Sequence, residues 1–216
     1  MPATETAPQP GAVAPELLAE YGDLGLWWVC VDVARRSADA GRDRLRRLSD
    51  DYRPREALTP GGRPATHDAA RAFARQVGLD PDATLLRPDA AARAAAMAGR
   101  LVPAGAVADA LLAVAVTSGV TVTAVDAARV DGPPVLRTAA DGELLGRGRR
   151  ARAVSPGTVV VADHQRVLAP LFADPPRALD PHRARRVLVW AVEVPGAPPL
   201  ETEEAVWHAG RFLSGR

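Results

Sequence analysis

The residues with the clearest chemical potential are two neighbours, Asp163 and His164. An aspartate beside a histidine is suited to proton transfer. The run Thr158 to Ala162 directly before them predicts a strand, however, and adjacent strand residues point to opposite faces. The two side chains can pair only if the strand has already ended. An aspartate that caps the turn after a strand is the alternative that we favour.

A second candidate for chemistry is the basic loop Gly146 to Arg152, which reads G-R-G-R-R-A-R. Glycine frees the backbone and guanidinium groups bind phosphates, so the loop is able to hold a nucleic-acid backbone. The alternative is a solvated surface loop. Because the chain contains no Lys and is rich in Ala and Arg, a compositional bias explains many of its arginines. The residues 34–48 mix Arg with Asp, which is typical of a solvated helix face.

Other kinds of site have no signature in the sequence. The four histidines and the single cysteine, Cys30, form no spacing that suits a metal ion, and no glycine-rich phosphate loop or nucleophile elbow occurs. We therefore predict no metal and no cofactor. With 27 basic and 26 acidic residues the net charge is +1, which creates no field toward nucleic acid or membrane. No apolar run reaches the roughly 18 residues of a membrane span. One cysteine fits a cytoplasmic location.

The elements that must position these residues follow from hydrophobic periodicity. The clearest unit runs from Val107 to Asp126 and consists of a helix, a stop at Gly119 and a short valine-rich strand. Thr66 is expected to cap the helix that follows it. The remaining expected elements are helices at 15–21, 34–48, 67–77, 88–98 and 201–213, strands at 26–33, 135–138, 158–162 and 187–194, and an apolar run at 167–172. This mixture predicts the α/β class.

The central unit resembles the tRNA-editing module of the phenylalanyl-tRNA synthetase beta subunit, called the B-three/B-four domain, which also occurs as free-standing proteins. The helix, glycine and strand of that family match this chain without a gap at Asp109, Ala113, Gly119, Ala124 and Asp126. Further matches are V-L-R-T-A at 135–139, G-E at 142–143, P-G-T-V-V-V-A-D at 156–163 and L-R-P at 86–88. The resemblance covers residues 66–213.

The resemblance implies an α/β fold of the editing-module kind, a β-sandwich of unusual topology flanked by helices. It divides the chain into a disordered tail at 1–14, an N-terminal strand-helix extension packed on the core at 15–65, and a B-three/B-four-like domain at 66–216. The implied partner is a tRNA or the acceptor end of an aminoacyl-tRNA. The implied activity is trans-editing, which is the hydrolysis of the ester of a mischarged aminoacyl-tRNA.

The sequence departs from the family at its polar site residues. The Thr-Asn pair of the family helix falls on Leu111 and Leu112, its strand histidine on Thr123, and its strand acid near Trp190. Its glycine-rich segment falls on residues 167–174, where every glycine is lost. The candidates that remain are Thr123, Asp126 and Asp163 for catalysis and Arg137, Trp190, Arg147, Arg149 and Arg150 for substrate binding.

Two functions follow from this pattern. One is an RNA- or tRNA-binding module with weak or altered editing. The alternative is a non-catalytic module that binds a small molecule or a protein on the same scaffold, since a fold does not fix its function. The near-zero net charge and the apolar residues at Leu111, Leu112 and Trp190 favour the alternative. Convergence of the arginines at 147, 149, 150 and 152 with Arg137 on one cleft would favour RNA.

Overall fold

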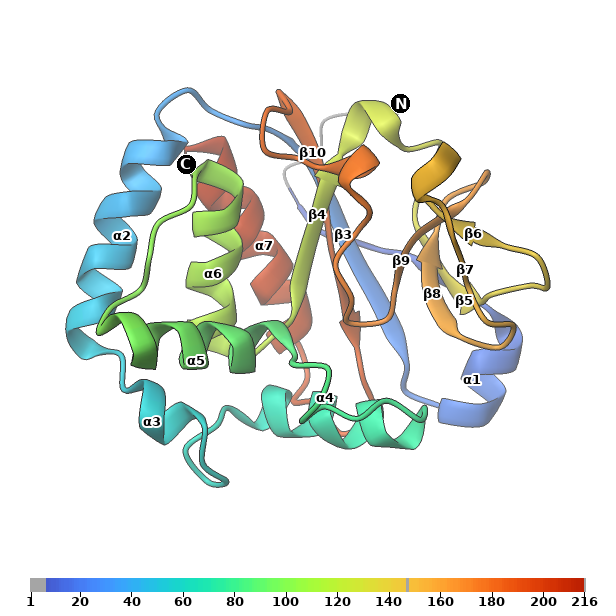
Figure 1. Cartoon of the computed structure of the whole chain (residues 1–216), viewed down its shortest axis with the longest axis horizontal. Helices are drawn as coiled ribbons and strands as arrows, with labels where there is room; N and C mark the ends of the chain where they lie inside the picture. Colours follow the sequence, from blue (N-terminus) through green and yellow to red (C-terminus); the bar gives the residue numbers. More distant parts are fainter. Residues whose placement is uncertain (1–6, 147, 216) are drawn as a thin grey trace.

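The predicted α/β class is confirmed by the computed structural model, which describes residues 7–146 and 148–215 (Figure 1). The strands form two sheets. Sheet A has the order β1-β3-β10-β4, and its neighbours are all antiparallel. Its strands are β1 (Gln9–Pro10), β3 (Gly25–Asp32), β10 (Arg186–Glu193) and β4 (Val122–Asp126).

Sheet B is built from shorter strands in the order β2-β5-β8-β9-β6-β7. Pairs β2-β5 and β6-β9 are parallel and the others are antiparallel. The strands are β2 (Ala12–Val13), β5 (Val135–Thr138), β8 (Val159–Ala162), β9 (Val167–Pro170), β6 (Leu144–Leu145) and β7 (Arg152–Ala153). The sequence predicted strands where β5 and β8 lie, and only an apolar run where β9 lies.

The main core lies between the two sheets. Trp28, Leu188 and Trp190 of sheet A share one buried cluster with Leu136 and Val161 of sheet B. Helices α1 (Pro15–Tyr21) and α4 (Ala65–Gln76) close this cluster with Leu17 and Phe73. Alternation along the strands sends every second side chain into this core.

Helices cover the opposite face of sheet A (Figure 1). Valines at 29, 31, 122, 187 and 189 pack there against α6 (Ala106–Ser118) and α7 (Glu201–Ser214). A further layer consists of α2 (Ser37–Asp51) and α5 (Arg87–Ala98), which meet α6 through Leu45, Ala95 and Ala113. The short segments are α3 (Pro54–Ala57), η1 (Ala127–Arg129), η2 (Gly148–Arg150) and η3 (Arg177–Leu179).

The unit of helix, glycine and strand is confirmed. Gly119 ends α6 with φ 73°, the left-handed conformation that glycine adopts at least cost. The predicted cap at Thr66 is wrong, because Pro64 is the residue before α4 and Thr66 is already inside the helix. The hydroxyl of Thr66 donates instead to the carbonyl of Ser118. This hydrogen bond ties the start of α4 to the end of α6.

Helix α2 begins at Ser37 and not at Ala34 as the sequence suggested. The backbone N–H groups of Val33 and Ala34 are used elsewhere, since they donate to the carbonyls of Arg185 and Leu213. Ser37 then donates its hydroxyl to the carbonyl of Ala34 at 2.7 Å. Contacts with β10 and α7 therefore delay the helix by one turn.

Within the predicted tail at 1–14, residues 9–10 and 12–13 form the short strands β1 and β2. Gln9 pairs with Trp28 in sheet A, and Ala12 pairs with Val135 in sheet B, so residues 9–13 bridge the two sheets. Strand β3, which lies in the predicted extension at 15–65, is an inner strand of sheet A between β1 and β10. The composition of residues 1–14 does not predict these two strands. Their hydrogen bonds come from pairing with β3 and β5, which belong to sheets that the rest of the chain forms. Within the described residues, no helix is long and apolar enough to cross a membrane.

Candidate functional site

Thr123 and Trp190 are the predicted site residues that the structure brings together. They lie opposite each other on β4 and β10, and only 5% and 3% of their surfaces are exposed. Both face sheet B and line a space of about 10 Å³ together with Thr121, Val161 and Phe172. Such a space holds about one water molecule. It is too small for the amino acid of an aminoacyl-tRNA.

Phe172 explains much of this closure. It lines the small space together with Leu171. Its φ of 60° is unusual for a residue with a bulky side chain, so packing must hold it there. Together, Leu171 and Phe172 occupy this side of the space.

Thr121 lines this space, and its hydroxyl allows a test of stability. Its Oγ1 is buried without a hydrogen-bond partner among the described residues. Thr121→Val removes this unsatisfied group at nearly constant volume, and we expect the free energy of unfolding to rise by about 1 kcal/mol. Thr66→Val, which deletes the bond to Ser118, is expected to lower it by about 1 kcal/mol. Urea unfolding measures the change in the free energy of unfolding for both variants. A lower free energy of unfolding in Thr121→Val would mean that the hydroxyl of Thr121 has a hydrogen-bond partner.

Asp126 and Asp163 act as turn caps. Asp126 accepts a hydrogen bond from the N–H of Ala128 at 3.0 Å and so caps η1. Asp163, whose side chain is fully buried, accepts from the N–H groups of Gln165 and Arg166 at 2.8 Å each and of Asp131 at 3.0 Å. These bonds fix the turn after β8 and join it to the loop before β5. Both carboxylates have the structural role that we favoured for Asp163.

Arg137 is engaged by Glu143. Two hydrogen bonds of 2.7 and 2.6 Å join its guanidinium to the carboxylate, which also accepts the N–H of Ala140. The hydrogen bonds from Arg137 hold the pKa of Glu143 below its ordinary value. The same bonds raise the pKa of Arg137, with a smaller contribution from the charge of Asp163. This pair clamps the connection from β5 to β6.

The basic loop forms the outer edge of sheet B. Arg147 lies outside the described residues, and Arg149 and Arg150 belong to η2 before the edge strand β7. Arg149 and Arg152 are exposed, whereas Arg137 is half-buried and paired. Arg137 is therefore already engaged by Glu143, whereas Arg149 and Arg152 face solvent.

Asp89, His67 and Arg71 form a buried charged cluster that the sequence did not predict. Asp89, at the start of α5, accepts a 2.7 Å hydrogen bond from Arg71 of α4, and its carboxylate lies 3.1 Å from Nε2 of His67. All three residues are at least nine-tenths buried. Asp82 makes a second contact with Arg71 from the surface. The spacing of His67 and Arg71, one helical turn apart, was the available signal.

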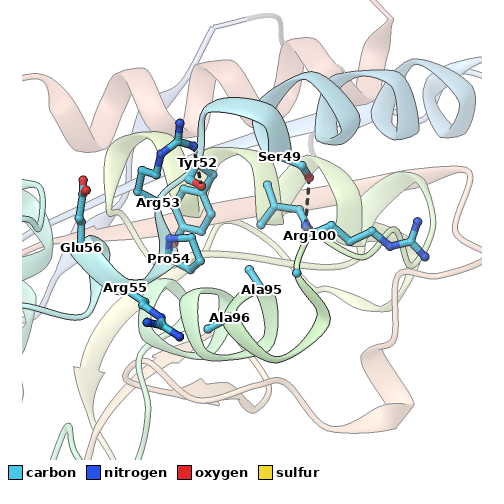
Figure 2. Close-up of a pocket in the computed structure, with 11 residues that line it drawn as sticks. Ser49, Tyr52, Arg53, Pro54, Arg55, Glu56, Ala95, Ala96 and Arg100 are labelled. Carbon is cyan, nitrogen blue, oxygen red and sulfur yellow. Dashed lines mark hydrogen bonds between the residues drawn. The ribbon is translucent and has the colours of Figure 1, made fainter.

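The pocket shown in Figure 2 opens where α2, α3 and α5 meet, and we call it the α2–α3–α5 pocket. Its volume is about 350 Å³. Ala95 and Leu101 form a buried apolar floor. The hydroxyl of Ser49 accepts the N–H of Leu101 at 3.0 Å and donates to the carbonyl of Leu45 at 2.8 Å, so the upper wall is fixed. None of the predicted site residues lines this pocket.

Polar groups of this pocket lie at its rim. Arg53 and Arg55 stand on one side and Arg100 on the other (Figure 2), and all three are exposed. Arg53 donates to the carbonyl of Asp50 at 3.0 Å, while none of the three forms an ion pair with another described residue. Burial, and then the charge of Asp89, raises the pKa of Tyr52. The phenol of Tyr52 is therefore protonated at neutral pH and available as a donor.

Across the residues that the structure describes, no three acidic, histidine or cysteine side chains lie close enough together to hold a metal ion. No protein-family model matches the sequence, and no curated protein matches it.

Proposed function

We propose that this protein is a non-catalytic binding module that holds a small molecule in the α2–α3–α5 pocket, on a scaffold similar to the tRNA-editing module. The observation that carries the proposal is a contrast of two spaces. The space beside Thr123 and Trp190, where the family resemblance places the chemistry, measures about 10 Å³, whereas the α2–α3–α5 pocket measures about 350 Å³. Ligand pockets typically begin at about 300 Å³.

The engagement of the polar candidates supports a non-catalytic role. Ester hydrolysis needs a positioned water and donors for the developing oxyanion. Asp126 and Asp163 accept backbone N–H groups, and Arg137 is held by Glu143. Moving any of them toward a substrate would break the turn that it holds. We further propose that the module acts in the cytoplasm, where its buried Cys30 is protected from oxidation.

RNA binding is the second candidate, because Arg149 and Arg152 of the basic loop are both exposed. In this proposal the partner is a tRNA acceptor end. Incubation with mischarged tRNA, followed by measurement of ester loss and of binding at several salt concentrations, tests it. Hydrolysis above the uncatalysed rate would overturn the non-catalytic proposal, and salt-dependent tRNA binding without hydrolysis would favour the second candidate.

A blocking variant tests the pocket itself. Ala96 lines the α2–α3–α5 pocket on an exposed turn of α5, so Ala96→Leu fills it without disturbing the core. We expect small molecules that raise the melting temperature of the wild type to bind Ala96→Leu at least about tenfold more weakly. Ala94→Leu, exposed on the same helix but outside the pocket, is the matched control. Library members that bind both variants equally would show that the ligand site is elsewhere.

A further inference from the structure

We infer that the ligand of the α2–α3–α5 pocket is an organic oxyanion, with one carboxylate or phosphate group on a compact apolar body. This inference rests on the proposed function and gives the chemical class of the ligand. It depends on the charges at the rim and on the composition of the floor.

The charges at the rim favour an anion. Three guanidinium groups, those of Arg53, Arg55 and Arg100, stand against one carboxylate, that of Glu56. Helices α2 and α5 both end beside the pocket, and each C-terminus carries about half a negative charge. Three guanidinium groups, one carboxylate and two helix ends together leave about one positive charge at the rim. Exposed groups of this kind attract an anionic ligand at low cost, because the ligand keeps part of its solvation.

Arg55 and Arg100 are the groups that we assign to the oxyanion. Arg53 already donates to the last carbonyls of α2, those of Asp50 and Tyr52, and offsets the charge of that helix end. The guanidinium groups of Arg55 and Arg100 form no ion pair with a described residue and flank the hollow from opposite sides (Figure 2). Guanidinium groups bind carboxylate and phosphate oxygens in a bidentate manner.

The interior of the pocket favours an apolar body. Ala95, Ala96 and Gly99 leave space on one face of α5, and Leu101 closes the end. Pro54 forms part of the opposite wall and stiffens the start of α3, which lowers the ordering cost of binding. A fully polar ligand would lose hydrogen bonds to water against this apolar floor and gain none in return.

Two pairs of probes test the inference, each pair sharing a naphthalene body and differing in charge. Titration calorimetry would compare 2-naphthoate with neutral 2-naphthamide, and 2-naphthyl phosphate with 2-naphthol, on the whole chain. We expect each anion to bind the wild type about tenfold more tightly than its neutral partner. In the double variant Arg55→Gln/Arg100→Gln the preference is expected to fall to about twofold. Arg93→Gln, exposed on α5 and outside the pocket, should retain the full preference.

The outcomes separate this inference from the proposed function. Equal binding of anion and neutral partner, with loss of both in Ala96→Leu, would overturn the anion inference and leave the small-molecule pocket standing. Binding of neither probe, together with no library ligand sensitive to Ala96→Leu, would overturn both. Displacement of 2-naphthoate by an acceptor-stem RNA hairpin at a lower concentration than by free phosphate esters would assign the arginines to RNA and overturn the small-anion inference.

Discussion

Replacing Asp89 with alanine is expected to lower the free energy of unfolding by about 3 to 5 kcal/mol. The carboxylate is buried and is contacted by Arg71 at 2.7 Å and by His67 at 3.1 Å. Its removal leaves the buried guanidinium of Arg71 without its interior partner. Denaturant unfolding, followed by circular dichroism, measures the loss.

Asp82→Ala is the matched control for this change. Asp82 contacts the same Arg71, but 64% of its side chain is exposed. A solvent-exposed ion pair contributes little to stability, so we expect a much smaller loss in Asp82→Ala than in Asp89→Ala. Comparable losses in Asp82→Ala and Asp89→Ala would show that burial of the Asp89 carboxylate has no energetic consequence, which would contradict the cluster as described.

The stabilisation by Asp89 is also expected to depend on pH. Burial alone raises its pKa, but the contacts with His67 and Arg71 outweigh burial, so the pKa in the folded state is lowered. A carboxyl with a lowered pKa stabilises fully above its ordinary pKa of about 3.9 and loses this effect as the pH falls through the folded value. The stability difference between wild type and Asp89→Asn should therefore be constant near neutral pH and shrink at acid pH. A difference that grows on acidification would contradict this sign.

Elements with strong periodicity could be predicted from the sequence, and elements stabilised by distant partners could not. Helix α6, Gly119 and β4 were found because local apolar spacing and a glycine stop specify them. Strands β1 and β2 have two residues each and depend on pairing with β3 and β5. No local pattern of residues can predict pairing with a distant strand. The predicted start of α2 was wrong for the same reason, since the carbonyls of Arg185 and Leu213 accept the N–H groups of Val33 and Ala34, which precede the helix.

The candidate site was less predictable than the fold. The resemblance named Thr123 and Trp190 as candidates, and the structure places them opposite each other on β4 and β10. Only the packing of Phe172 in three dimensions shows that the space beside them is nearly closed. The α2–α3–α5 pocket joins Tyr52 and Arg100 across about fifty positions of sequence. It arises from small residues on α5, and an alanine-rich helix gives no indication of which face is left uncovered.

Gly119→Ala carries the second large expected effect, a loss of about 2 to 4 kcal/mol in the free energy of unfolding. About 1 kcal/mol comes from placing an L-residue at φ 73°. The rest comes from contact, because an added Cβ would lie 2.8 Å from Cβ of Pro64 and 2.9 Å from Cβ of His67. Equilibrium unfolding in urea measures the loss.

Gly99→Ala separates the two contributions to this loss. Gly99 ends α5 with φ 70°, almost the same conformation, but an added Cβ would meet nothing within 4 Å. We expect a loss of about 1 kcal/mol there. The difference between the two variants then measures how tightly the start of α4, with Thr66 and His67, is packed on the end of α6. Equal losses would mean that this contact yields easily, and that Gly119 is required for its backbone conformation alone.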